Sequence, residues 1–416
     1  MTTFYRMFAL SLMITLNGVV NLQGQKVTTE PTFKVDFTGK SHLYTPTADK
    51  PQSKLWFMDS RWWALLHADR GPSLWERTDR GWVEHEEVNR DLQGVSGRAD
   101  VWYENRTVTA VCVSDQSLTV IRTFPSEPRD SRTNETMWHS KILARLILPV
   151  GHNANVETAT IVKDASGVWW ISANYGRSIY VWASADAKSW SAPILLGEDI
   201  SDDDISTVSI LDGAVTVIWS DQRSEAFYAR EHLNGDPYAD WSPIKVIDSG
   251  NRAADDHINT ALSSDGTLWV NTKNEIDKVG FPNLTLHVRT PSGKWRNFPY
   301  LTLEQFVGPS RPVVITTPDP AVVLAGYSVY DRTHKKKYEE RYDDRIAFGV
   351  IDTTATDVLI RKKDVIAPDS SFQSIVNNIT GPKVPFPEDG PWIILASDHK
   401  GNIYEADLRT LIEGLK

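Results

Sequence analysis

Cysteine is almost absent from this chain, and several other features that would define a class of protein are missing too. A single cysteine, Cys112, occurs among 416 residues, which excludes an intramolecular disulfide and leaves stability to a packed core. The net charge is −10 and no basic run is longer than the three lysines at residues 335–337, so nucleic acid is not an expected partner. Helical periodicity is confined to residues 408–416, which excludes an α/β barrel.

The common signatures of metal, phosphate and hydrolase-triad chemistry are missing as well. The sequence contains no HExxH, CxxC, EF-hand or GxSxG pattern and no glycine-rich phosphate loop, each of which places its ligands or nucleophile at a fixed spacing. We therefore expect no metal and no other cofactor.

The first 24 residues are typical of a secretion signal. Arg6 gives a positive flank to an apolar stretch at residues 7–16, and that stretch is too short to cross a bilayer. No later stretch approaches a transmembrane length. We expect residues 1–24 to be removed and residues 25–416 to form one secreted or periplasmic domain, which we predict to be a monomer.

Short strands rich in Val, Ile, Trp and Tyr dominate the remainder, separated by turn signals such as Asp212-Gly213 and Asp265-Gly266. Seven similar segments recur roughly every 45–60 residues, the spacing of one propeller blade. Each opens on polar residues, and they begin at Lys50, Ser96, Asn153, Ser201, Ala254, Gly308 and Ser370. We predict an all-β fold, a single β-propeller of seven four-stranded antiparallel blades, with six blades as the alternative. The last repeat has room for three strands only, so residues 32–37 should supply the fourth and close the ring.

The polar residues that open each repeat form the candidate binding surface. In a propeller of this kind, the first strand of each blade starts at the face that carries the axial funnel, and the second strand ends there. Charges placed beside such buried strands need a partner or a purpose, and arginine is a natural ligand for an anionic sugar. We expect an oligo- or polysaccharide there, with Glu157 in the same ring of polar residues. The predicted substrate-binding residues are Lys54, Arg98, Asp100, Asn155, Tyr175, Arg177, Gln222, Lys273, Arg311 and Tyr327.

Two acidic clusters suggest catalysis. Asp204 and Asp256 open adjacent repeats, and paired carboxylates in unequal environments are the apparatus of glycoside cleavage. Asp221 is a third candidate, and His257 could tune a neighbour or act as a base. The other interpretation, that these aspartates cap the turns that lead into the strands, stays open.

One segment resembles a known repeat. Ser184, Asp186, Ser189 and Trp190 match the core of the Asp-box found in sialidase-like (BNR-repeat) propellers, which implies a hairpin between the third and fourth strands of a blade. The chain is also similar to secreted bacterial propellers with KPQSKLW, DDI and ADDHIN segments. The arginine motif of true sialidases is missing.

Three functions remain open on the sequence. We favour a secreted glycoside hydrolase. The alternatives are a polysaccharide lyase, in which His257 and a tyrosine act as base and acid, and a propeller that binds carbohydrate or protein without catalysis. Lyase products absorb in the ultraviolet, whereas hydrolysis products do not.

Overall fold

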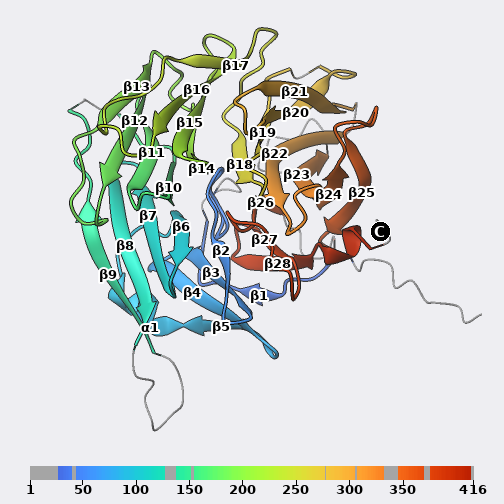
Figure 1. The fold of residues 1–416 in the computed structure, drawn as a ribbon. Helices are drawn as coiled ribbons and strands as arrows, with labels where there is room; N and C mark the ends of the chain where they lie inside the picture. Colours follow the sequence, from blue (N-terminus) through green and yellow to red (C-terminus); the bar gives the residue numbers. More distant parts are fainter. Residues whose placement is uncertain are drawn as a thin grey trace, which may run out of the picture.

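The chain forms seven four-stranded antiparallel sheets arranged as the blades of a ring (Figure 1). The computed structural model describes residues 27–39, 44–126, 137–150, 154–276, 278–304, 307–331, 345–369 and 375–413. These residues confirm the all-β propeller and the count of seven blades, so the six-bladed alternative is wrong. The predicted secretion signal, residues 1–24, lies outside the described residues.

Blades are numbered here in chain order. Blade 1 consists of β2 (Leu55–Met58), β3 (Arg61–Ala68), β4 (Gly71–Thr78) and β5 (Gly81–His85). Blade 2 consists of β6 (Ala99–Glu104), β7 (Thr107–Ser114), β8 (Ser117–Pro125) and β9 (Trp138–Arg145). Blade 3 consists of β10 (Ala159–Lys163), β11 (Trp169–Tyr175), β12 (Ser178–Ser184) and β13 (Ile194–Glu198). Blade 4 consists of β14 (Ser206–Leu211), β15 (Ala214–Asp221), β16 (Ala226–Leu233) and β17 (Lys245–Ser249). Blade 5 consists of β18 (Ile258–Leu262), β19 (Leu268–Lys273), β20 (Pro282–Arg289) and β21 (Trp295–Thr302). Blade 6 consists of β22 (Val307–Thr316), β23 (Val323–Asp331), β24 (Arg345–Ile351) and β25 (Leu359–Ile366). Blade 7 consists of β26 (Asn377–Thr380), β27 (Ile393–Ser397), β28 (Asn402–Asp407) and β1 (Phe33–Lys34).

The ring is closed by the N-terminal strand, as predicted. β1 pairs antiparallel with β28, with Phe33 opposite Ile403. The Thr28 hydroxyl also donates a hydrogen bond of 2.6 Å to the carbonyl of Glu405. Blade 7 therefore takes its outermost strand from one end of the chain and its other three from the other end.

The core lies between neighbouring blades, because central strands are buried on both faces. All eight residues of β15 are buried, in keeping with the run AVTVIW, which is apolar apart from Thr216. Large aromatic side chains fill the spaces between sheets, and Trp62, Trp170, Trp182 and Trp219 are each at most 2% exposed. These tryptophans are part of the core, as expected for most of the sixteen.

Side chains on the inner strands tie each blade to the next. Every junction of the ring has a hydrogen bond from a polar residue in or beside a first strand. In ring order these are Ser53 N to Asp100 Oδ1 (2.7 Å), Ile161 N to Asp100 Oδ2 (2.7 Å), Val208 N to Thr160 Oγ1 (2.9 Å), the Ser209 and Thr260 hydroxyls (2.7 Å), Val314 N to Asn259 Oδ1 (2.9 Å), Arg311 Nη1 to Asn378 Oδ1 (3.0 Å) and Lys54 N to Thr380 Oγ1 (2.9 Å). Buried polar groups of inner strands thus have partners across the junctions.

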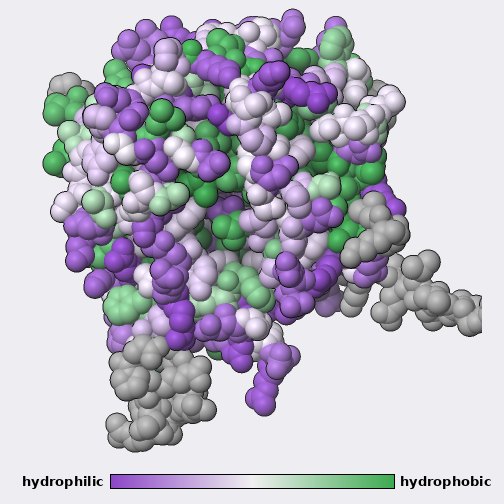
Figure 2. Space-filling view, in the orientation of Figure 1, coloured by the Kyte–Doolittle hydropathy of each residue, from purple (hydrophilic) through white to green (hydrophobic). Residues whose placement is uncertain are grey.

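Helix is scarce in the described residues. α1 (Glu86–Asp91) connects β5 with β6, and a 3-10 turn, η3 (Arg409–Leu411), stands within the predicted C-terminal helix. No described helix has the length and apolar character needed to cross a membrane. The face in Figure 2 is largely hydrophilic around its rim, with hydrophobic side chains visible in the central hollow.

The Asp-box-like segment forms the expected turn between β12 and β13. The Asp186 carboxylate accepts hydrogen bonds of 2.8 Å from the backbone N–H groups of Lys188 and Ser189, and Trp190 Nε1 donates to the carbonyl of Ala187. Ala187 has a φ of 61°, where glycine would be unstrained. The turn is structural and lies at the opposite end of β12 from the start of the blade.

Candidate functional site

A polar cavity of about 500 Å³ opens at the starts of the first strands. It is lined by five carboxylic acids, three cations, one histidine and five other residues, which come from blades 2 to 6 and from the segment before β2. A cavity that touches five consecutive blades and the segment leading into blade 1 must lie on the axis of the ring. The lining residues are Tyr44, Asp49, Lys50, Arg98, Asp115, Ala154, Asn155, Val156, Glu157, Gly176, Asp202, Asp256, His257 and Arg311.

His257 is held by two carboxylates just before β18. Its Nδ1 lies 2.8 Å from Asp255 Oδ1 and 2.7 Å from Asp256 Oδ1. Its other ring nitrogen, Nε2, is buried and has no hydrogen-bond partner among the described residues. The ring is therefore fixed in orientation by one nitrogen, while the second is left without a partner.

Lysine side chains neutralise these two carboxylates. Lys50, from the segment before β2, forms an ion pair with Asp256, and Lys273, at the end of β19, forms one with Asp255. Burial alone would raise the pKa of Asp256, but the Lys50 ammonium and His257 hold it well below its ordinary value. Burial would likewise lower the pKa of Lys50, yet the carboxylate of Asp256 raises it. Asp256 is therefore kept ionised.

The donor atoms of Asp255, Asp256 and His257 lie within 4.8 Å of one another, close enough to ligate a metal ion. The two ammonium groups already supply the positive charge that a cation would bring. The acidic cluster is therefore balanced by groups of the protein itself, and we assign no metal to it.

Glu157 provides the second carboxyl group of interest. It stands two residues before β10, and its backbone N–H donates to Asn174 Oδ1 (3.0 Å). Burial raises the pKa of its carboxyl group to about 7, an effect that Lys50 reduces and the nearby charges of Asp49 and Asp256 increase. Glu157 is thus largely protonated under slightly acidic conditions, whereas Asp256 in the same cavity is ionised.

Two arginines flank these acids. Arg98 Nη2 lies 2.9 Å from Asp49 Oδ2 and also donates to the carbonyl of Glu157. Arg311 is 7% exposed, and its Nη1 donates to the neutral amide of Asn378 at 3.0 Å. Its φ of 48° and a break in the β22–β23 register beside it turn the backbone at the rim of the cavity.

Five of the predicted site residues meet in this cavity, and the others do not line it. Those that line it are Arg98, Asn155, Asp256, His257 and Arg311. The prediction that second-strand ends converge there holds only for Asp115 and Gly176, which follow β7 and β11.

Asp204 and Asp221 serve their own loops. Asp204 is fully buried and accepts hydrogen bonds from the backbone of Ser201 (2.7 Å) and Gln222 (3.1 Å). Asp221 Oδ1 accepts a hydrogen bond of 3.1 Å from the backbone N–H of Ser224. Its Oδ2 accepts one of 2.6 Å from the hydroxyl of the same serine. The turn-capping interpretation therefore describes both residues. Asp256 lines the cavity but Asp204 does not, so the expected Asp204–Asp256 pair does not form there.

The remaining predicted ligands have structural partners away from the cavity. Lys54 is buried and donates to the Ala99 carbonyl at 2.6 Å. Asp100 accepts hydrogen bonds from Ser53, Ile161 and Lys383 and so links neighbouring blades. Gln222 bonds to Asp203 and Asp204. Arg177 pairs with Asp199, Lys273 with Asp255, and Tyr175 and Tyr327 pack into hydrophobic clusters between sheets. Since these groups are committed to the fold, the geometry gives them no direct contact with a ligand in this cavity.

Asp49, Lys50 and Glu157 are among the cavity residues that the sequence did not assign to the site. Lys50 and Glu157 belong to the same opening segments as the predicted residues. Their position at the start of a repeat was the available signal.

Comparisons with known proteins assign neither a family nor an activity to this chain. No family model matches the chain, and no curated protein matches it. Among solved structures, the catalytic domain of a GH62 α-L-arabinofuranosidase from Coprinopsis cinerea is 11% identical with a TM-score of 0.37, covering 62% of this chain and 91% of that one. A protein of unknown function from Dyadobacter fermentans is 9% identical with a TM-score of 0.45, covering 79% and 100%. Polysaccharide lyase Uly1 is 9% identical with a TM-score of 0.43, covering 87% and 91%. At such low identity these likenesses do not transfer a function.

Proposed function

We propose that this protein is a glycan-cleaving enzyme, a glycoside hydrolase whose two working carboxyl groups are Glu157 and Asp256. The observation that carries the proposal is the opposite displacement of two pKa values within one cavity: that of Glu157 is raised to about 7 and that of Asp256 is lowered. Environments that separate two carboxyl groups in this way assign one as acid and the other as base or nucleophile.

In this mechanism Glu157 transfers its proton to the glycosidic oxygen as the bond to the anomeric carbon breaks. Asp256 either attacks that carbon or removes a proton from the water that does so. Water supplies the hydroxyl group of the new reducing end, and the proton that it loses restores the acid. Lys50 and His257 keep Asp256 ionised and fixed, so they are positioning residues.

The cavity also offers groups for binding sugar hydroxyls. Arg98, Arg311 and Asn155 supply N–H donors, Asp49 and Asp202 supply acceptors, and the ring of Tyr44 lines the same space. Polar groups on several sides of a cavity of this size fit a sugar ring. The secretion signal predicted for residues 1–24 is consistent with a substrate outside the cell.

A glycan panel tests the proposal, with reducing ends and ultraviolet absorbance followed together. Wild type should release reducing ends without absorbance, and Glu157→Gln and Asp256→Asn should each lower kcat by at least about 100-fold. Asp199→Asn is the matched control, because its side chain is 86% exposed and it lies outside the cavity lining. Full activity in both cavity variants would overturn the assignment.

A polysaccharide lyase is the second candidate, and it is favoured by one observation. The unpartnered Nε2 of His257 and the phenol of Tyr44 belong to the same cavity, and such a pair can serve as base and acid. Absorbing products that disappear in His257→Gln would move the assignment to this reaction. No product from any glycan in the panel would favour the binding protein.

A further inference from the structure

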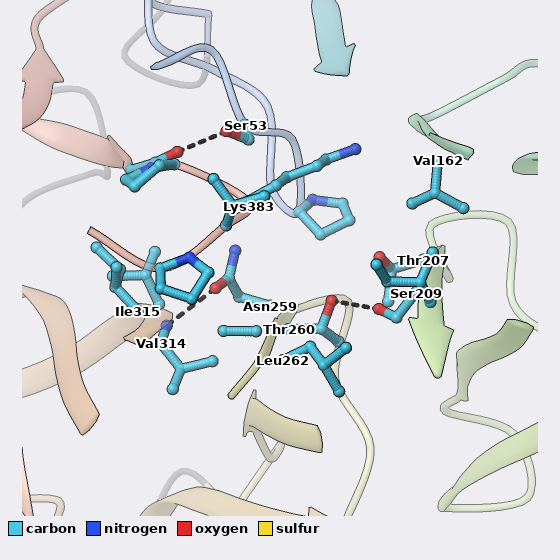
Figure 3. Close-up of a pocket in the computed structure, with 18 of the residues that line it drawn as sticks. Ser53, Val162, Thr207, Ser209, Asn259, Thr260, Leu262, Val314, Ile315 and Lys383 are labelled. Atoms are coloured by element: carbon cyan, nitrogen blue, oxygen red, sulfur yellow. Dashed lines mark hydrogen bonds between the residues drawn. The ribbon is translucent and has the colours of Figure 1, made fainter. Parts of the chain in front are cut away.

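A second cavity, of about 280 Å³, lies where the first strands end. Its wall is formed by β14, β18 and β22 together with Trp102 on β6, Val162 on β10 and residues 381–385. In Figure 3, residues of β14 lie to the right of this space, residues of β18 below it and residues of β22 at the lower left, with Lys383 above. Because blades 2 to 6 and the segment after β26 all contribute, this cavity also lies on the axis of the ring.

This cavity is separate from the polar one. The two have no lining residue in common, although consecutive residues Lys50 and Pro51 line one each. The segment at residues 50–53 therefore runs between them. It is anchored by Gln52 Nε2 to the Ala159 carbonyl (3.1 Å) and by the Ser53 hydroxyl to the Gly381 carbonyl (2.5 Å).

The wall of the second cavity is mainly apolar and lacks unpaired charge among the described residues. Val162, Val208, Leu262, Ile315 and Pro382 are typical of it. Its one charged side chain, Lys383, reaches away to Asp100 and the Ile161 carbonyl and leaves its aliphatic stem at the cavity. A charged ligand would lose hydration without finding a counter-ion, so the site selects against charge.

Several polar groups of this wall are already satisfied. The hydroxyls of Ser209 and Thr260 are 2.7 Å apart, and Asn259 Oδ1 accepts from Val314 N at 2.9 Å (Figure 3). One buried donor is not. The indole N–H of Trp102 has no partner among the described residues. The amide nitrogen of Asn259 is drawn toward the space in Figure 3.

We propose that this cavity is a second binding site, for an uncharged, mainly apolar small molecule with a hydrogen-bond acceptor. Its volume exceeds the roughly 150 Å³ of an apolar cavity that holds benzene, so a fused two-ring molecule fits the scale. Apolar surface supplies the affinity, and an acceptor on the ligand satisfies a donor whose burial without a partner is unfavourable.

The test is a fluorescence titration of the intact protein with prodan, an uncharged naphthalene ketone whose emission shifts to the blue in apolar surroundings. Wild type should show saturable, blue-shifted binding. Leu262→Trp, at the half-buried end of β18, should fill the cavity and weaken binding at least tenfold. Trp102→Phe keeps an aromatic ring and removes the N–H, and about fivefold weaker binding is expected from the loss of one hydrogen bond.

Glu157→Gln and 2-naphthoate are the matched controls. Glu157→Gln alters only the polar cavity and should bind prodan as wild type does, while the charged naphthoate should bind far more weakly. If Leu262→Trp does not fold, Trp102→Phe still tests the site. The proposal is overturned if wild type shows no saturable binding, if Glu157→Gln abolishes binding, or if neither lining variant weakens it. Glycan cleavage does not enter this readout, so either proposal can fail alone.

Discussion

Replacing Glu157 with glutamine isolates one carboxyl group whose ionisation the fold opposes. Its pKa of about 7 in the folded chain compares with an ordinary value of 4.5. At about 1.4 kcal/mol for each pKa unit, ionising this group in the folded protein costs about 3 kcal/mol more than in the unfolded chain. Glutamine retains the shape of the side chain and removes the titration.

The direction of the pH effect follows from which state holds the proton. Below the unfolded pKa the carboxyl is protonated in both states, and its contribution to stability is fully present. As the pH rises, the unfolded chain releases the proton first, so the free energy of unfolding falls until the pH has passed the folded pKa of about 7.

Urea unfolding of wild type and Glu157→Gln between about pH 4 and pH 8 measures this effect, because other titrating groups cancel in the difference. Relative to the variant, wild type should lose about 3 kcal/mol across that range, with most of the loss between the two pKa values. A difference that does not vary with pH would show that the Glu157 carboxyl is not held protonated by the fold, and the acid role proposed for it would fail.

Three further expectations concern other parts of the molecule. Asp100→Asn leaves the buried Lys383 ammonium without its carboxylate and should lower the free energy of unfolding by on the order of 3 kcal/mol; an unchanged urea midpoint would contradict the bridging role. Lys50→Met removes the ammonium that lowers the pKa of Asp256, so the acid limb of the kcat/KM profile should move to higher pH, and a fixed limb would count against that ion pair. Asn105 is exposed and begins an Asn-x-Thr sequence, the acceptor for N-linked glycans, which also occurs at buried positions. In a host that glycosylates exported proteins, mass spectrometry should find glycan at Asn105, and its presence at the buried sequons would contradict the packing. The buried sequons are Asn283 and Asn378, 2% and 4% exposed.

Much of the fold could be predicted because short sequence patterns indicate where its strands and turns lie. The polar openings at Lys50, Ser201 and Ala254 each precede an inner strand, and turn pairs such as Asp212-Gly213 separate that strand from the next. Repetition of one plan favoured seven blades over six, and the seven sheets of the structure confirm that count. The shortage of strands in the last repeat pointed to the N-terminal strand as the closing element, which the pairing of β1 with β28 confirms.

The candidate site was harder to predict because a carboxylate that caps a turn and one that faces the axis occupy similar positions in the sequence. Asp221 is followed at the third position by Ser224, whose hydroxyl and N–H it binds, a spacing that favours a cap. Asp256 and Glu157 carry no such local signature. Their roles depend on Lys50, which lies more than one hundred residues away in the sequence, and that proximity exists only once the ring has closed.

Closure of the ring by β1 also governs how the chain can fold and misfold. The bond between Thr28 and Glu405 joins positions 377 residues apart, so this contact is about as non-local as the chain allows, and such pairings form late. Until β1 docks, the outer edge of β28 is an open strand edge able to accept the same strand from another copy. We expect refolding at high protein concentration to yield strand-exchanged dimers that gel filtration would separate from monomer, and refolding at low concentration to favour closure within one chain.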